Sequence, residues 1–138
     1  MISKKCMYAL KAVLALARNT GGKPMTIHQI ADAESIPPRF LEAILRDLKQ
    51  NGLTDSVRGK DGGYLLAQPP NKITMGQIIR LIEGPWFTAA DGEPADIFTP
   101  MWERAEECLE KVFEQKDFQT LVAEREDLRR SATIDYSI

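Results

Sequence analysis

Two basic residues and three glycines lie together in the stretch SVRGKDGGYLL, residues 56–66. Arg58 and Lys60 flank Gly59, and Gly62 and Gly63 follow. A lysine in a glycine-rich loop can bind phosphate, but the P-loop places GK before Ser or Thr, between a strand and a helix. Here the lysine precedes the glycine pair and a second strand-like segment follows, so the pattern does not favour a nucleotide-binding loop.

Two explanations remain for this stretch. A structural hairpin uses glycine or aspartate at positions of positive φ, but a turn of this size needs one or two glycines rather than three. Missing side chains also let a backbone approach a partner closely, and the two basic residues would place positive charge at that point. The pattern therefore favours a hairpin whose tip contacts a polyanion.

The segments before the hairpin must position it, and they have the pattern of a helix-turn-helix. Helical spacing of apolar residues predicts a first helix over 3–19. Thr26 and Gln29 form a capping box that starts a short second helix. Pro38 suits the first turn of a third helix, which ends at Asn51 and Gly52. The third helix is amphipathic and carries basic side chains at Arg39, Arg46 and Lys49.

The remaining elements complete a winged helix-turn-helix. A second capping box at Thr74 starts a helix that ends at Gly84, and a long helix begins at Thr99 and Pro100. The predicted fold class is therefore mostly α, with a two-stranded wing and a long C-terminal dimerisation helix. We expect a DNA-binding domain over 1–84, a loop or linker over 85–99, dimerisation helices over 100–130 and a flexible tail over 131–138.

Composition narrows the functional classes. Residues 1–84 hold twelve Lys and Arg against seven Asp and Glu, whereas residues 85–138 hold six against thirteen. This asymmetry favours a polyanionic partner for the first part, although chance variation in solvated faces is an alternative. Nothing resembles a signal peptide and no run reaches the roughly 18 apolar residues of a membrane helix, so we expect a cytoplasmic protein without a membrane partner. One histidine and no nucleophile motif argue against an enzyme.

The run SVRGKDGGYLLAQPPNKITMGQIIRLIEG resembles the wing and following helix of the Rrf2 family of bacterial regulators (the IscR, NsrR and CymR group). KKCMYALKAVLALA and IPPRFLEAILRDLKQNGL resemble its first helix and its recognition helix. The resemblance covers residues 1–84 closely and 100–130 in outline. It implies a homodimeric regulator that binds double-stranded DNA and either represses or activates transcription, with repression the preferred prediction.

The resemblance also implies which residues face DNA, in three groups. The recognition helix would present Pro38, Arg39, Phe40, Glu42 and Arg46. The wing would present Arg58, Gly59, Lys60, Gly62 and Gly63. The second helix would contribute Thr26, His28 and Gln29, whose side chains or amides could reach phosphates. Phe40 and Leu41 are expected to divide their roles, one facing inward and the other facing DNA.

Dimerisation is expected through the long helix from Pro100. Its apolar stripe is larger than a small winged helix needs to cover, although the helix could instead fold back on its own domain. The predicted interface residues are Met101, Trp102, Ala105, Leu109, Val112 and Phe113.

The chain departs from the best-known relatives in its cysteines. Those relatives sense with an iron–sulfur cluster and carry three cysteines after the EG motif, whereas residues 85–100 here have none. Cys6 and Cys108 alone cannot supply four ligands, so we expect no cofactor. A thiol sensor remains open, because Lys4 and Lys5 could lower the pKa of Cys6, whereas packing is the preferred interpretation for Cys108.

Three further alternatives stay open. An effector, either a small molecule or a protein, could act through a cavity between the first helix and Trp86, Phe87 and Trp102. The winged helix could instead be a protein-interaction module that docks through its acidic C-terminal helix, since fold alone does not settle function. A thiol- or cluster-responsive regulator is the third.

Overall fold

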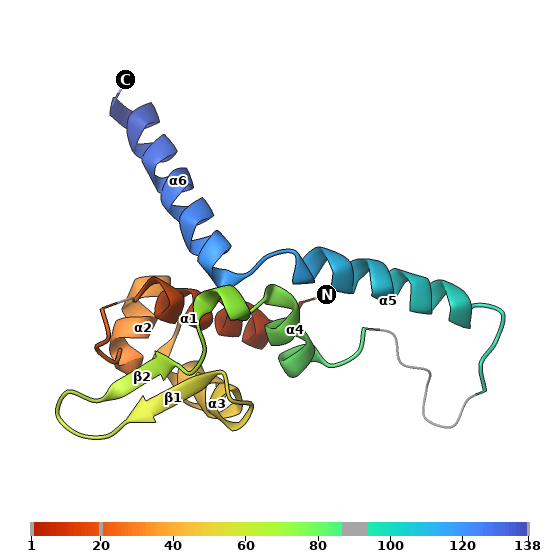
Figure 1. Ribbon diagram of the computed structural model, residues 1–138, viewed down its shortest axis with the longest axis horizontal. Helices are drawn as coiled ribbons and strands as arrows, with labels where there is room; N and C mark the ends of the chain where they lie inside the picture. Colours follow the sequence, from red (N-terminus) through yellow and green to blue (C-terminus); the bar gives the residue numbers. More distant parts are fainter. Residues whose placement is uncertain (1, 20, 87–93, 138) are drawn as a thin grey trace.

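The computed structural model describes residues 2–19, 21–86 and 94–137, and it confirms the predicted winged helix-turn-helix fold class. Helices α1–α4, the two strands and a short 3-10 helix form one body, from which α5 and α6 project in different directions (Figure 1). The elements are α1 (Lys4–Arg18), α2 (Ile27–Glu34), α3 (Pro38–Gln50), β1 (Thr54–Val57), β2 (Gly63–Leu66), η1 (Pro70–Lys72), α4 (Met75–Glu83), α5 (Thr99–Glu114) and α6 (Phe118–Ser137).

Side-chain caps fix where the helices of the body begin. Ser3 accepts a hydrogen bond from the amide of Cys6 at the start of α1. The predicted capping boxes are both present, Thr26 with Gln29 at α2 and Thr74 with Gln77 at α4. Each box satisfies two amides that a helix leaves without an internal partner. These local contacts set the position of α2, from which α3 follows.

The turn after α3 joins the recognition helix to the wing. Gly52 has φ of +74°, its amide donates to the carbonyl of Lys49 at 3.0 Å, and the amide of Leu53 donates to the carbonyl of Leu48 at 3.0 Å. This pair of bonds is the Schellman motif. Leu48 and Leu53 are buried, so the turn is fastened to the core and the wing starts at a fixed point.

One hydrophobic core holds the body together. It is formed by α1, α2, α3 and η1–α4, and it is closed by Phe118 at the start of α6. Apolar side chains at helical spacing on α3 supply its centre, namely Leu41, Ile44, Leu45 and Leu48. Their burial, worth about 1.5–3 kcal/mol for each side chain, fixes the rotation of α3 and therefore which residues of α3 face outward.

The two strands pair antiparallel, with Thr54 opposite Leu66 and Val57 opposite Gly63. The wing is also attached to the connection between α1 and α2. The amide of Tyr64 donates to the carbonyl of Met25 at 2.7 Å, and the amide of Met25 donates to the carbonyl of Tyr64 at 2.9 Å. The base of the wing is thus bonded on both sides of β2.

The C-terminal helix α6 is fastened at its first half. Asp117 accepts from the amide of Thr120 at 2.7 Å and caps the helix. Arg125 forms an ion pair with the buried carboxylate of Glu34 on α2. The helix continues to Ser137, so residues 131–137 are helical where the sequence predicted a frayed end. Among the described residues, no helix combines the length and apolar character needed to cross a bilayer.

Candidate nucleic-acid interface

The exposed side of α3 carries all five residues predicted for the recognition helix. The side chains of Pro38, Arg39, Phe40, Glu42 and Arg46 are exposed, whereas Leu41 is fully buried. Phe40 is 39% exposed and Leu41 faces the core, as the inward half of the expected division requires, whereas contact of Phe40 with DNA stays a prediction.

The polar side chains of α3 differ in what they contact. The guanidinium of Arg46 lies 3.9 Å from the carboxylate of Glu42, and both side chains are exposed, so this pair contributes little to stability. Lys49 donates to the hydroxyl of Ser56 on β1 at 2.6 Å. This second contact links the recognition helix directly to the wing, which lies on the same side of the body as α3 (Figure 1).

The glycines of the wing have reasons within the chain itself. A Cβ on Gly62 would lie 2.2 Å from the carbonyl oxygen of Val57, and one on Gly63 would lie 2.3 Å from that of Met25. Gly59 has φ of +110°, where glycine is favoured. Folding of the hairpin thus accounts for all three glycines without a close approach to a partner. Their contact with DNA stays a prediction.

Arg58 and Lys60 are exposed in the wing tip, and no ion pair involves either of them within the described ranges. The cleft beside the tip has a volume of about 390 Å³ and separates it from the start of α2. Lys60 lines one side of the cleft and Lys23 lines the other. Sequence reasoning missed Lys23, because nothing in its local pattern indicates that the loop before α2 lies beside the wing.

Thr26, His28 and Gln29 are exposed at the start of α2, as their predicted role requires. The side chains of Thr26 and Gln29, however, are used in the capping box, at 3.2 Å and 2.9 Å from each other's amides. The amides left for a phosphate are those of Ile27 and His28 in the first turn. The cleft itself is lined by the two lysines and also by Asp61, which offsets part of their positive charge, and Ile27 and His28 are not part of its lining.

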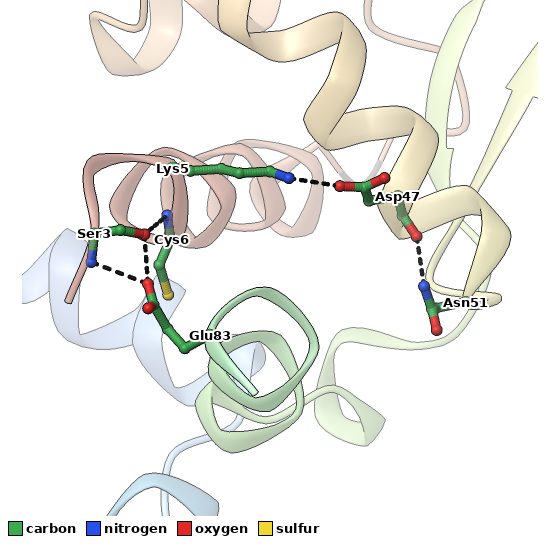
Figure 2. A network of polar contacts seen from close by, with 6 residues as sticks. All are labelled: Ser3, Lys5, Cys6, Asp47, Asn51 and Glu83. Atoms are coloured by element: carbon green, nitrogen blue, oxygen red, sulfur yellow. Dashed lines mark hydrogen bonds and ion pairs between the residues drawn. The ribbon is translucent and has the colours of Figure 1, made fainter. Parts of the chain in front are cut away.

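Cys6, on α1, lies beside Ser3 and Glu83 within a polar network shown in Figure 2. The thiol is fully buried, and burial together with the Glu83 carboxylate raises its pKa to about 11. The expected lowering of this pKa by neighbouring lysines is wrong, because Lys5 points to Asp47 at 2.8 Å. Ser3 donates to Glu83 and, through the hydroxyl hydrogen bond, lowers the pKa of that carboxyl group.

The outer face of α5 is apolar and exposed. Met101 and Val112 are 59% and 58% exposed, and none of the α5 residues is fully buried. Ala105 and Leu109 are half-buried, while Phe113 instead stacks on Trp86 of its own chain at 5.9 Å. The preference for packing at Cys108 is wrong for the single chain, where this thiol is exposed.

Trp86 borders a hollow between α4 and α5 rather than a cavity against α1. The hollow has a volume of about 90 Å³, which is small for an organic effector, and Trp102 does not line it. Phe87, the other aromatic of the predicted cavity, lies outside the described residues. The described residues therefore do not bring Trp86 and Trp102 into one cavity, and the existence of an effector stays a prediction.

Comparison with known proteins gives consistent matches. The family model Rrf2, described as an iron-dependent transcriptional regulator, matches residues 2–124. An Rrf2-like HTH-type regulator of Rhodobacter capsulatus is 43% identical over 88 residues, 62% of this chain and 59% of the relative. CymR of Bacillus subtilis is 33% identical over 125 residues, 88% of this chain and 89% of CymR.

Solved structures agree. The structure of B. subtilis CymR, named the global cysteine regulator, matches with a TM-score of 0.76 and 30% identity, covering 89% of this chain and 96% of CymR. The structure of T. potens IscR matches with a TM-score of 0.78 and 27% identity, covering 93% of this chain and 90% of IscR.

Proposed function

The chain belongs to the Rrf2 family of DNA-binding transcriptional regulators, which are not enzymes, and we propose that it is a homodimeric, cluster-free repressor. The observation that carries the proposal is the surface formed by α3 and the wing. Basic and polar side chains of both elements are exposed there, and Lys49 and Ser56 join the two elements. Helix α3 would enter the major groove, and the wing residues 58–63 would follow the flanking backbone or minor groove.

Residues of α3 would recognise the bases of the operator, and residues of the wing would supply affinity for the DNA backbone. Glu42 can accept from the amino group of cytosine, and Arg39 can donate to guanine. Arg58 and Lys60 would contact phosphates, which position a protein without reading sequence. Arg46 is held by Glu42 at 3.9 Å in the absence of DNA, so binding would exchange a weak surface ion pair for a phosphate or base contact.

The spacing of apolar residues on α5 supports a dimer. Phe98, Met101, Ala105, Cys108 and Val112 recur at alternating intervals of three and four residues, the spacing of a coiled-coil seam. The helix is about 24 Å long at 1.5 Å per residue, and this face is not covered by its own chain. Pairing with a second copy would cover the seam and would place the two α3 helices about 34–36 Å apart, one turn of DNA.

The donor set does not fit an iron–sulfur cluster. A cluster needs four ligands, usually thiolates, and the sequence has two cysteines. Cys6 is buried with its pKa raised to about 11, so it resists the deprotonation that metal binding requires. The described residues contain no group of three His, Cys, Asp or Glu placed to hold a metal ion. These facts support regulation without a cluster.

The proposal is tested by selecting duplexes that bind the purified full-length protein, followed by binding titrations at several salt concentrations. We expect a palindromic site and a steep salt dependence, because each phosphate contact releases a counterion. Arg58→Ala should weaken binding to all duplexes, whereas Glu42→Ala should change which duplexes bind. Lys72→Ala, an exposed cation on η1, is the control and should leave binding unchanged.

Three outcomes would contradict parts of the proposal. Enrichment of no sequence would contradict sequence-specific binding. A protein that remains monomeric by analytical ultracentrifugation at high micromolar concentration would contradict the dimer. A visible absorption band in anaerobically purified protein would contradict the absence of a cluster, and repression is checked by transcription from a promoter that carries the selected site.

A further inference from the structure

Arg39, Phe40 and Tyr8 form a stack at the start of α3. The Arg39 guanidinium carbon lies 4.8 Å from the centre of the Phe40 ring. The rings of Phe40 and Tyr8 have centres 5.4 Å apart and are inclined by 34°. Tyr8 belongs to α1, so the stack connects a helix of the scaffold to the outer surface of the recognition helix.

The stack holds a cation that has no carboxylate partner. Within the described residues no ion pair involves Arg39, whereas the neighbouring Arg46 is paired with Glu42. A guanidinium over an aromatic ring is attracted by the ring quadrupole. Its planar fork of donors remains available for a bidentate contact. The contact with Phe40 therefore restricts the position of Arg39 without using its hydrogen-bonding groups.

Packing alone does not explain the exposed ring. The core position on this turn of α3 is taken by Leu41, which is fully buried, whereas Phe40 is 39% exposed and contacts only the half-buried Tyr8 among aromatic residues of the described chain. The Phe40 ring lies at the edge of the core between Tyr8 and Arg39, a position that suits it to support the Arg39 guanidinium.

We infer that Tyr8 is a positioning residue which, through Phe40, orients Arg39 for one base pair of the operator. Restricting a long side chain before binding lowers the entropy that binding must remove. Arg39 then discriminates better between guanine and other bases, because a bidentate contact tolerates little misalignment. The inference rests on the proposed DNA-binding function and adds a residue of α1 to the determinants of sequence preference.

The test measures the base preference at every operator position by competition between duplexes, with parent, Tyr8→Leu, Arg39→Ala and the double variant. Leucine keeps apolar volume at residue 8 but removes the ring, and Tyr8→Phe keeps the ring as the matched control. Arg39→Ala should reduce the preference at one base pair by about tenfold or more. Tyr8→Leu should reduce it at the same base pair by at most roughly two- to fivefold, because it removes the support of the Phe40 ring, whose exposed cation–π contact with Arg39 is worth that much.

In the double variant, Tyr8→Leu should cause no loss beyond that of Arg39→Ala, and Tyr8→Phe should match the parent. The inference is overturned if Tyr8→Leu leaves the base preference unchanged or weakens binding to all duplexes equally. It is also overturned if Tyr8→Leu lowers the base preference by the same factor whether or not Arg39 is present. Tyr8→Met, which also keeps apolar volume at residue 8 without a ring, provides the same test if Tyr8→Leu does not fold. A parent that prefers no duplex would overturn the proposed function itself, which is a distinguishable result.

Discussion

Replacing Gly63 with alanine tests how the wing is anchored at its base. The new Cβ would lie 2.3 Å from the carbonyl oxygen of Met25 and 2.5 Å from its carbonyl carbon, both backbone atoms that cannot rotate away. Relief requires β2 to move from the connection between α1 and α2. That movement breaks the two hydrogen bonds between Met25 and Tyr64, at 2.7 and 2.9 Å.

The expected loss of stability follows from these contacts. Two backbone hydrogen bonds contribute about 2 kcal/mol, and holding alanine at the φ of Gly63, +150°, costs about 1 kcal/mol more. Gly63→Ala should therefore lower the free energy of unfolding by about 3 kcal/mol. Gly59→Ala, with φ of +110° and open space around it, should cost about 1 kcal/mol.

Urea unfolding followed by circular dichroism measures these differences, provided that the slope of free energy against urea is unchanged. Gly21→Ala is the matched control, because nothing lies within 4 Å of its Cβ and its φ is ordinary, and its effect should stay within about 0.5 kcal/mol. Equal midpoints for Gly63→Ala and Gly21→Ala would refute the anchoring of the wing through Met25.

Four other perturbations have defined outcomes. In a Cys108→Ala background, Cys6 should react with a thiol reagent about 100-fold more slowly in the folded than in the unfolded protein at pH 8, because its pKa is about 11 rather than 9.0; equal rates would contradict its burial. The same shift favours the folded state below pH 9 and is lost as pH rises to 11, so Cys6→Ala should show less alkaline destabilisation in pH-dependent urea titrations. Lys23→Ala should reduce the salt dependence of DNA binding by about one unit of log–log slope, and an unchanged slope would remove Lys23 from the interface. Gly76→Ala should loosen α5, since its Cβ would lie 2.4 Å from the Glu114 carboxylate; proteolysis should reveal this, and Gly76→Ala should have a smaller effect in a Glu114→Ala background.

Sequence alone predicts those parts of the fold that local rules control. The capping boxes at Thr26 and Thr74 and the start of α3 at Pro38 depend on residues within three positions of each other. The turn at Gly52 depends on a positive φ that glycine adopts without strain. Each of these features was recovered at its correct residue, and together they define the order of elements that is specific to a winged helix.

The features that sequence could not predict depend on contacts between distant segments. The raised pKa of Cys6 comes first from its burial in the folded chain and then from Glu83, which is 77 residues away along the sequence. The need for glycine at Gly63 comes from Met25, and the place of Lys23 beside Lys60 comes from the position of the wing. The position of Lys5 next to Cys6 in the sequence did not predict the pKa of the thiol, because the Lys5 side chain pairs with Asp47 on α3 instead.

The outward projection of α5 links the activity of the proposed dimer to its abundance. Because no residue of this helix is fully buried within its own subunit, the helix would gain most of its shielding from water by meeting another copy. While single chains predominate, the concentration of paired chains rises with the square of the amount synthesised. A change in expression would then produce a larger relative change in operator occupancy. This response to abundance would require no signalling molecule.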